Sequence, residues 1–469
     1  MLIDFQLRNF RSFAKEQNFS LVASRRLGDD FCEHAFKIPN TEERLLRAGV
    51  VWGSNGAGKS NLFKAMRLAA SLVLSGNEKG RAIPVEPFAF SEQYRNAPTS
   101  FEFRFVAEGS VYRYGFSADS ERVHEEWLML QSGNAEKVLF ERELAGGDDH
   151  LQIGRILSER VYPRIVALGK VGVRANQLFL AAIRDSIPVG EYGALVSPVI
   201  DWFENQLTFV GVGDRFHGLA EFLASDRAFA EFAGEFLKRA GTGVNGLDVE
   251  TFTLDDGQLK SLGFDPGDID VMMARAGNEA DSKITNFDGS VMSVEKGEGA
   301  KVTVRRINTE HQSGSEGKTN LPLSEASDGT LRLLHLIPAL YLMKDTSRVF
   351  VIDELDRSLH PNLSREFLKF FLQSCRGQCR QMVVTTHEDR LLDLELLRRD
   401  EIWFVEKDSD GASSLRSLSE FKIRRDLKID KGYLNGRFGG VPQLGQLFGL
   451  MPDISEGIEH KGPEHKERD

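Results

Sequence analysis

The sequence predicts an α/β protein in which a mixed central sheet and an antiparallel β subdomain form one head, interrupted by a mainly helical insertion. Three observations support this prediction. An apolar strand at residues 48–52 runs into a glycine-rich turn and an amphipathic helix, which is how a parallel β–α unit begins. Residues 100–130 change to the period of two that antiparallel strands show. A mostly helical pattern follows over residues 160–239, before apolar strands return.

The composition is that of a globular protein with material for more than one core. The 469 residues carry 59 Lys plus Arg and 70 Asp plus Glu, a net charge of −11, and 41% are apolar. This argues against a disordered chain and against binding nucleic acid over the whole surface, while a local basic groove remains open. The three cysteines are too few for a disulfide framework, and Cys375 and Cys379 lack further zinc ligands nearby.

The N-terminal residues alternate apolar and polar side chains, so they predict a strand and not a signal peptide. The longest apolar stretch, residues 330–343, is interrupted by Arg332, His335 and Pro338. No run therefore reaches the roughly 18 apolar residues that a bilayer span needs. We expect a cytoplasmic protein with no membrane partner.

The elements follow in order along the chain. Strands are predicted at 2–7, 19–22 and 48–52, a helix at 59–74, a hairpin turning at Glu108–Gly109, and a strand at 123–130. Helical runs include residues 170–185 and 220–241, and short strands are expected at 249–254 and 300–307. Helices from Thr330 and Asn362 alternate with strands at 349–352, 382–385 and 402–405. The polar C-terminal residues are expected to be disordered.

The run GSNGAGKS at residues 53–60 fits the pattern of a phosphate-binding loop. Its glycines let backbone N–H groups face phosphates, and the helix that follows adds its positive N-terminal end. Lys59 would neutralise the β- and γ-phosphates, and Ser60 would bind Mg²⁺. The flanking strand and helix are the context that this motif requires.

The run VFVIDE at residues 349–354 is an apolar strand that ends in two acids. At the carboxyl edge of a parallel sheet, Asp353 can hold Mg²⁺ through water, and Glu354 can polarise an attacking water as general base. His387 ends a second apolar strand, 33 residues beyond Glu354. A lone histidine there is usually structural, but this spacing favours a role in sensing the γ-phosphate.

The run SDGT at residues 327–330 directly precedes an apolar helix. A serine at this position is first of all an ordinary helix cap. Its place 26 residues before Asp353 raises the alternative that the helix N-terminus faces a phosphate bound by another subunit.

The ordered set of motifs resembles the ATPase head of ATP-binding-cassette (ABC) proteins. It looks most like the RecF/SMC-like branch and the OLD-like ATPases of bacterial anti-phage and abortive-infection systems. RNFRSF at 8–13, Asn61, SLHP at 358–361 and residues 433–442 add to the resemblance. SDGT stands where the family signature stands but departs from the LSGGQ of transporters. The family's glutamine-bearing loop is not clear, although Gln93 lies in a plausible region.

The resemblance implies an ATPase that uses ATP and Mg²⁺ and works as a homodimer or higher homo-oligomer. In the family, ATP lies between the phosphate loop of one subunit and the signature of the other. Arg11 could also contact the nucleotide, with an ordinary surface arginine as the alternative. The implied residues are Glu354 and His387 for catalysis, Asn55, Gly56, Gly58, Lys59, Ser60, Asn61, Arg11, Ser327 and Gly329 for nucleotide binding, and Ser60 and Asp353 for the metal.

Three functions compete at this stage. A transporter subunit is disfavoured because Ser327 lies 268 residues beyond Lys59. A RecF-like DNA repair ATPase that clamps DNA stays the alternative, although the acidic charge does not indicate nucleic acid. We favour an anti-phage ATPase that controls a separate effector, a nuclease or toxin encoded nearby. Only 82 residues follow His387, and they lack the acids of a TOPRIM nuclease. The insertion and the region of Arg424, Arg425 and Lys428 are candidate partner surfaces.

Because residues near 59 and 353 must meet at one nucleotide, the head is expected to be discontinuous. We assign residues 1–155 to its N-terminal part and 156–245 to a helical insertion. Residues 246–425 form the C-terminal part of the head, and 426–469 form an extension with a polar tail.

Overall fold

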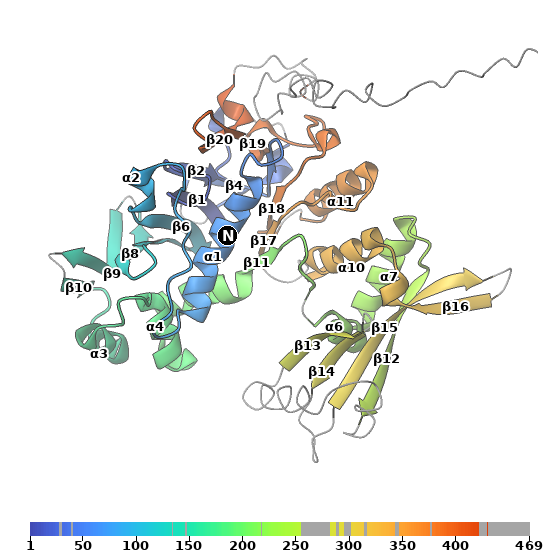
Figure 1. The fold of residues 1–469 in the computed structure, drawn as a ribbon, viewed down its shortest axis with the longest axis horizontal. Coiled ribbons are helices and arrows are strands. Elements are labelled where there is room, and N and C mark those ends of the chain that lie inside the picture. The colour runs from blue at the N-terminus through green and yellow to red at the C-terminus, as the bar shows by residue number, and fades with distance from the viewer. Residues whose placement is uncertain are drawn as a thin grey trace, which may run out of the picture.

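The computed structural model describes residues 1–421 and Ile429, apart from residues 28–30, 39–40, 134, 146–147, 217, 255–281, 288–289, 295–301, 314–316, 343–346 and 376–377. Three larger sheets organise these residues, together with a two-stranded sheet of β3 (Ala35–Lys37) and β4 (Arg44–Leu46). Figure 1 shows two of the larger sheets on one side of the molecule and the third sheet set apart from them.

The central sheet is mostly parallel. Its order is β11 (Leu207–Val210), β17 (Val349–Ile352), β18 (Gln381–Thr385), β5 (Ala48–Trp52), β19 (Ile402–Lys407) and β20 (Ser413–Ser417), and only the β19–β20 pair is antiparallel. Strands β5, β17 and β18 are buried along their whole length, which explains why they consist almost entirely of apolar residues. Because these three strands are parallel, their carboxyl ends meet at one edge.

The antiparallel sheet supplies the β subdomain that the alternating pattern predicts. Its order is β10 (Asp148–Ile153), β9 (Ala135–Ala145), β8 (Val123–Ser132), β7 (Ser110–Ala118), β6 (Thr99–Ala107), β1 (Leu2–Arg8) and β2 (Gln17–Ser20). The predicted hairpin is confirmed, since Glu108 and Gly109 connect β6 to β7 and both have positive φ. Helix α2 (Glu92–Arg95) precedes β6.

Helix α1 (Lys59–Ser75) lies between the antiparallel sheet and the central sheet (Figure 1). Its apolar residues join the largest hydrophobic cluster, which also contains side chains of β1, β6 and β17. Aromatic rings fill the space beside it, and the ring centroids of Phe105 and Trp202 lie 4.1 Å apart in a stacked arrangement. The helix that starts at the phosphate-loop motif is therefore clamped by both sheets.

The third sheet has the order β12 (Gly246–Leu254), β15 (Val302–Ser313), β14 (Ser290–Val294) and β13 (Ser282–Phe287), with β16 (Gly317–Pro322) also paired to β15. Helices α6 (Leu219–Ser225), α7 (Arg227–Arg239) and α10 (Asp328–Tyr341) lie next to it and share a separate hydrophobic cluster with it. Helix α11 (Pro361–Ser374) packs on the central sheet through Phe367 and Phe371, in a cluster that also contains Leu336 and Leu340 of α10.

Residues 156–245 differ in part from the helical insertion that the sequence predicts. They contain α3 (Pro163–Val171), α4 (Phe179–Ser186), α5 (Gly193–Asp201), the π-helical turn Trp202–Gln206, α6 and α7, but also β11. Strand β11 pairs in parallel with β17, so this segment contributes an edge strand to the central sheet. The run LTFV has the β-branched and aromatic residues that favour a strand, and its helical surroundings masked this signal.

The predicted helical run at 170–185 is broken at residues 172–178 because a tertiary contact fixes where α4 begins. Glu126 of β8 is fully buried, and its carboxylate accepts hydrogen bonds from the backbone N–H groups of Phe179 (2.5 Å) and Leu180 (3.0 Å). Burial raises the pKa of Glu126, and these N–H groups oppose that rise. A distant acid thus caps the helix, which no local pattern indicates.

The division into domains at 155, 245 and 425 stays a prediction. Of the extension at 426–469, only Ile429 belongs to the described residues, so residues 433–442 lie outside them. Arg424, Arg425 and Lys428 also lie outside the described residues. Among the residues that are described, no helix is both long and apolar enough to cross a membrane.

We predict that Gln381→Leu destabilises the fold by about 3 kcal/mol, because three buried backbone groups would lose their partner. The Gln381 side chain is fully buried, accepts from the Leu2 N–H at 2.7 Å, and donates to the carbonyls of Leu2 (2.8 Å) and Leu46 (3.0 Å). Chemical denaturation measures the change. Gln373→Leu on exposed helix surface is the matched control, and equal effects of the two substitutions would contradict the prediction.

Candidate functional site

The loop at residues 53–60 connects β5 to α1 at the carboxyl edge of the central sheet. Gly58 has a φ of 122°, which side-chain-bearing residues rarely adopt. A Cβ atom at this position would lie 2.6 Å from Ser413 Oγ and 2.8 Å from Ser12 Oγ. Gly58 is therefore required twice, by its backbone angle and by the close approach of two other segments.

Lys59 begins α1 and its side chain is folded back onto the loop. Its Nζ donates to the carbonyl oxygens of Gly53 (2.7 Å) and Ser54 (3.1 Å) and lies 3.3 Å from His387 Nδ1. Burial lowers the pKa of Lys59 to about 8, while the nearby charges of Asp356, Glu354 and Asp353 act in the opposite direction. The lysine thus lies among three carboxylates and still has a depressed pKa.

Asp353, directly after β17, connects the two sequence motifs. Its Oδ1 accepts a hydrogen bond from Ser60 Oγ at 3.2 Å and from Thr385 Oγ1 at 2.6 Å. These three residues lie at the ends or starts of β17, α1 and β18. The structure therefore brings the phosphate-loop motif and the Asp–Glu motif together, 293 residues apart in the chain.

Glu354 has a left-handed backbone with a φ of 49°, an unusual conformation for a residue with a side chain. Its N–H donates to Thr385 Oγ1 at 2.8 Å, and its carboxylate lies 3.5 Å from a guanidinium nitrogen of Arg357. The hydrogen bond to Thr385 of β18 thus fixes the turn after β17. Glu354 is half-buried at this edge of the sheet.

His387 follows β18 and is held by Asp356. The carboxylate of Asp356 accepts from the His387 N–H at 3.2 Å and from Thr386 Oγ1 at 2.6 Å. Burial, followed by the charge of Lys59, lowers the pKa of His387. At neutral pH the ring is therefore a neutral imidazole beside Lys59.

Ser327 and Gly329 lie at the N-terminal end of α10. Ser327 is exposed, and its Oγ accepts the Thr330 N–H at 3.2 Å, so the ordinary capping role is present. A Cβ atom on Gly329 would lie 2.7 Å from the carbonyl oxygen of Ser358. The start of α10 is thus in close contact with the SLHP turn at residues 358–361.

The remaining predicted residues lie around the loop. Asn55 and Gly56 are exposed on it, and Asn61 Nδ2 donates to Ser12 Oγ at 2.8 Å. Arg11 is not free, because its guanidinium pairs with the Glu86 carboxylate and its N–H donates to the Glu86 carbonyl at 2.6 Å. Gln93 is exposed on α2, and no hydrogen bond in the described structure connects it to the loop.

For three contributors to the site the sequence predicts no role. Arg332 on α10 is buried and donates to the carbonyls of Gly211 (2.8 Å), Asp353 (2.8 Å) and Glu354 (3.2 Å). Thr385 orders the acids, and Ser413 donates to the Ala57 carbonyl of the loop. A signal in the sequence is Arg332 itself, a charged residue within an otherwise apolar helix.

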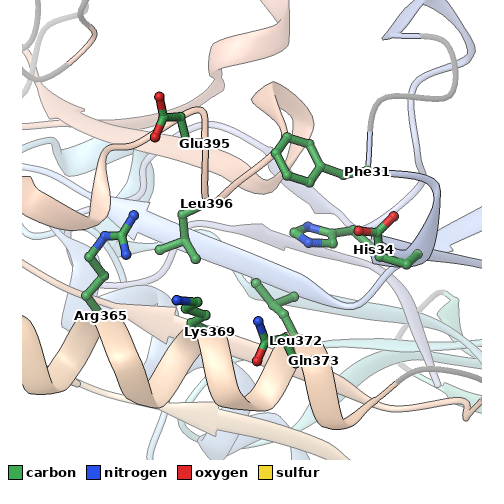
Figure 2. A pocket seen from close by; sticks show the side chains of 9 residues that line it. Phe31, His34, Arg365, Lys369, Leu372, Gln373, Glu395 and Leu396 are labelled. Atoms are coloured by element: carbon green, nitrogen blue, oxygen red, sulfur yellow. The ribbon is translucent and has the colours of Figure 1, made fainter.

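A cavity of about 240 Å³ lies elsewhere, between α11 and the turn at residues 31–34 (Figure 2). Two of the charged groups on its wall form ion pairs. Arg365 pairs with Asp393 at 2.6 Å, and the His34 ring pairs with the fully buried Glu401 at 2.9 Å. The side chains around the cavity are Phe31, Glu33, His34, Arg365, Lys369, Leu372, Gln373, Glu395 and Leu396.

Comparison with known proteins places these motifs in a family. The sequence pattern of the family described as "AAA domain, putative AbiEii toxin, Type IV TA system" matches residues 50–150 and 258–393, about half of the chain. The first matched segment contains the phosphate loop, and the second contains SDGT, Asp353 and His387. None of the curated proteins matches the chain.

Two solved structures of SMC heads are similar to this chain at low sequence identity. The SMC head domain from Thermotoga maritima is 14% identical with a TM-score of 0.37, and the match covers 90% of this chain and 99% of that one. A crystal structure of the SmcHead bound to the C-winged helix domain of ScpA is 12% identical with a TM-score of 0.41, covering 89% and 97%.

We predict that ATP affinity is constant below about pH 8 and falls above it, by up to tenfold per pH unit. Phosphates favour the charged form of Lys59, whose pKa in the free protein is about 8, so binding above that pH requires proton uptake. Titration calorimetry from pH 7 to 9.5 measures the profile.

The exposed Lys64→Ala variant on the same helix should keep this pH profile. In Lys59→Arg, whatever binding remains should not change with pH, because the guanidinium stays protonated. An affinity that does not change through pH 9.5 in the wild type would contradict the assignment to Lys59.

Proposed function

We propose that this protein is a nucleotide-controlled component of a bacterial anti-phage system. The premise is that the chain belongs to this AAA-domain family and is a P-loop ATPase with an ABC-type head. ATP-dependent assembly would control a separate effector protein. One observation carries the ATPase chemistry in this proposal, the Asp353 carboxylate that binds both Ser60 and Thr385.

Lys59 and the backbone of residues 53–60 would hold the phosphates of ATP. The exposed Asn55 and Gly56, the constrained Gly58, and Asn61 at the start of α1 would shape this cradle. The positive end of α1 faces the same place. Arg11 would reach the nucleotide only by leaving Glu86, so its contribution is the smallest of the set.

Ser60 and Asp353 fit a magnesium ion. Both offer oxygen atoms, the ligands that Mg²⁺ prefers, and these atoms lie 3.2 Å apart. Ser60 would hold the ion directly and Asp353 through water, and the hydrogen bond between them would keep both oxygens at the same place. When bound, the ion would neutralise charge on the β- and γ-phosphates.

Glu354 would accept a proton from the attacking water, and its position is fixed by Thr385 and Arg332. His387 would contact the γ-phosphate from the neighbouring strand. Its neutral ring can donate one hydrogen bond, and Asp356 fixes the backbone that carries it. Both residues leave the same sheet edge as the phosphate loop.

Ser327 and Gly329 would act on the ATP of a second subunit. Ser327 is exposed and opens a helix of 14 residues, so its N–H groups can face an anion from outside the chain. A homodimer would bury two such nucleotides, and ATP binding would then stabilise the dimer by mass action. Larger homo-oligomers would need contacts besides these, because the reciprocal dimer uses both motifs of each chain.

The defence role is supported by the description of the matched family, which names a toxin and a type IV toxin–antitoxin system. The net charge of −11 agrees better with a protein partner than with a general DNA clamp. An effector, a nuclease or toxin from a neighbouring gene, is therefore the partner that we propose.

We predict that Glu354→Gln retains ATP binding, lowers turnover by at least 100-fold and increases the dimer fraction with ATP, since the general base is removed without loss of the phosphate cradle. Phosphate release and light scattering measure the two effects. Lys59→Ala is the control that should lose ATP binding. Unchanged turnover in Glu354→Gln would contradict its role as base.

We predict that mixing Lys59→Ala with Ser327→Arg restores turnover that neither variant has alone. In a mixed dimer that shares ATP across subunits, one site combines the intact loop of one chain with the intact SDGT run of the other. If both motifs acted on the same nucleotide within one chain, every site would carry a defect. A mixture that stays inactive, although mixed dimers form, would contradict the shared site.

We predict that cells carrying this gene with its neighbours resist phage, and that resistance is lost in Lys59→Ala and in a deletion of the adjacent effector gene. Plaque counts measure resistance, and protein levels are matched by blotting. Sensitivity to DNA damage in the Lys59→Ala strain, with unchanged plaque counts, would instead favour the repair alternative.

A further inference from the structure

We propose that the ring of Phe90 is the surface on which the base of the bound nucleotide stacks. This inference rests on ATP binding at the phosphate loop and adds to it the group that recognises the base. Phe90 lies in the loop of residues 86–97, which contains α2 and leads to β6. None of the sequence motifs includes these residues.

Phe90 is 71% exposed, whereas the exposed phenylalanines Phe252 and Phe370 are each 39% exposed. A single exposed apolar side chain is common, but a ring this large and this accessible next to a ligand site requires an explanation. A planar aromatic face open to solvent is the structure on which nucleic-acid bases stack in other proteins.

The ring is held in place although it is exposed. It packs edge to face on the buried Phe88, with ring centroids 5.6 Å apart. The N–H of Phe88 donates to Asn9 Oδ1 at 2.9 Å, and Asn9 Nδ2 donates to the carbonyls of Tyr94 and Ala97. The loop is thus fixed to the N-terminal turn, so little ordering of the loop would oppose stacking.

A short hairpin connects Phe90 to the phosphate loop. Gly411 lies in the β19–β20 turn, and a Cβ atom there would lie 2.9 Å from a Phe90 ring carbon. Two residues later, Ser413 Oγ lies 2.6 Å from the Cβ position of Gly58 and binds the carbonyl of Ala57. Two residues of chain span about 7 Å at most, so the ring and the loop are within reach of one nucleoside triphosphate.

The loop that carries Phe90 is also connected to the segment beside the phosphate loop. Arg11 donates its N–H to the Glu86 carbonyl and pairs with the Glu86 carboxylate, and the Oγ of its neighbour Ser12 lies 2.8 Å from the Cβ position of Gly58. Stacking recognises the π-face of any base and not its hydrogen-bonding edge. The site should therefore bind ATP and GTP with affinities within a few-fold of each other.

The test compares ATP with magnesium tripolyphosphate, which carries the phosphates without a base. Calorimetry is done on the full chain for the wild type, Phe90→Ala, Phe90→Tyr and Val189→Ala, the last being a 73% exposed apolar residue elsewhere. We expect Phe90→Ala to weaken ATP binding about tenfold and to leave tripolyphosphate binding unchanged. Phe90→Tyr and Val189→Ala should match the wild type with both ligands.

A second measurement uses Phe90→Trp, whose added fluorescence should be quenched by ATP and not by tripolyphosphate. Equal weakening of both ligands in Phe90→Ala would overturn the inference, since it would indicate a damaged loop. Less than a twofold loss of ATP affinity would also overturn it. A wild type that binds tripolyphosphate but gains nothing from the base would overturn stacking alone, whereas a wild type that binds neither ligand would overturn the ATP site as well.

Discussion

The hydrogen bonds of Asp353 are the constraint on which the rest of the site depends. Its Oδ1 accepts from Ser60 and from Thr385, so one oxygen atom fixes the start of α1 and the end of β18 relative to β17. This geometry exists only because β5, β17 and β18 are parallel and end at one edge. The antiparallel sheet, in turn, packs on α1 from the other side and keeps the helix in line with the loop.

A second connection joins this edge to the exposed start of α10. Arg332, one turn into that helix, binds the carbonyls of Asp353 and Glu354 and the carbonyl of Gly211 after β11. Burial lowers the pKa of Arg332 because its guanidinium loses solvation. The hydrogen bonds to these carbonyls offset part of that loss and hold the guanidinium in place. A shift of the α10 N-terminus at Ser327 would therefore be transmitted through Arg332 to the turn that carries Glu354.

The sequence was most informative where a local pattern and a chemical motif coincide. The strand at 48–52, the strand at 349–352 and the hairpin at Glu108–Gly109 could be predicted because their residues favour one local structure. Strand β11 and the start of α4 could not, because β17 and Glu126, far away in sequence, determine them. The motifs predict roles for Lys59, Asp353 and His387. The hydrogen bonds by which Thr385, Asp356 and Arg332 hold two of these residues depend on tertiary contacts, so only the fold shows them.

The charges at the sheet edge give a physical reason for a shared nucleotide site. In one chain the Lys59 ammonium faces Asp353, Glu354 and Asp356, and the depressed pKa of His387 means that its ring adds no charge at neutral pH. Bringing a polyanionic triphosphate to these three carboxylates costs electrostatic energy, which Lys59, the end of α1 and the nearby Arg332 and Arg357 offset in part. Mg²⁺ on Ser60 and Asp353 would supply two charges, and the N-terminal end of α10 from a second copy would supply a further positive dipole. Dimerisation would then complete the charge balance of the site, which makes ATP binding and assembly parts of one equilibrium.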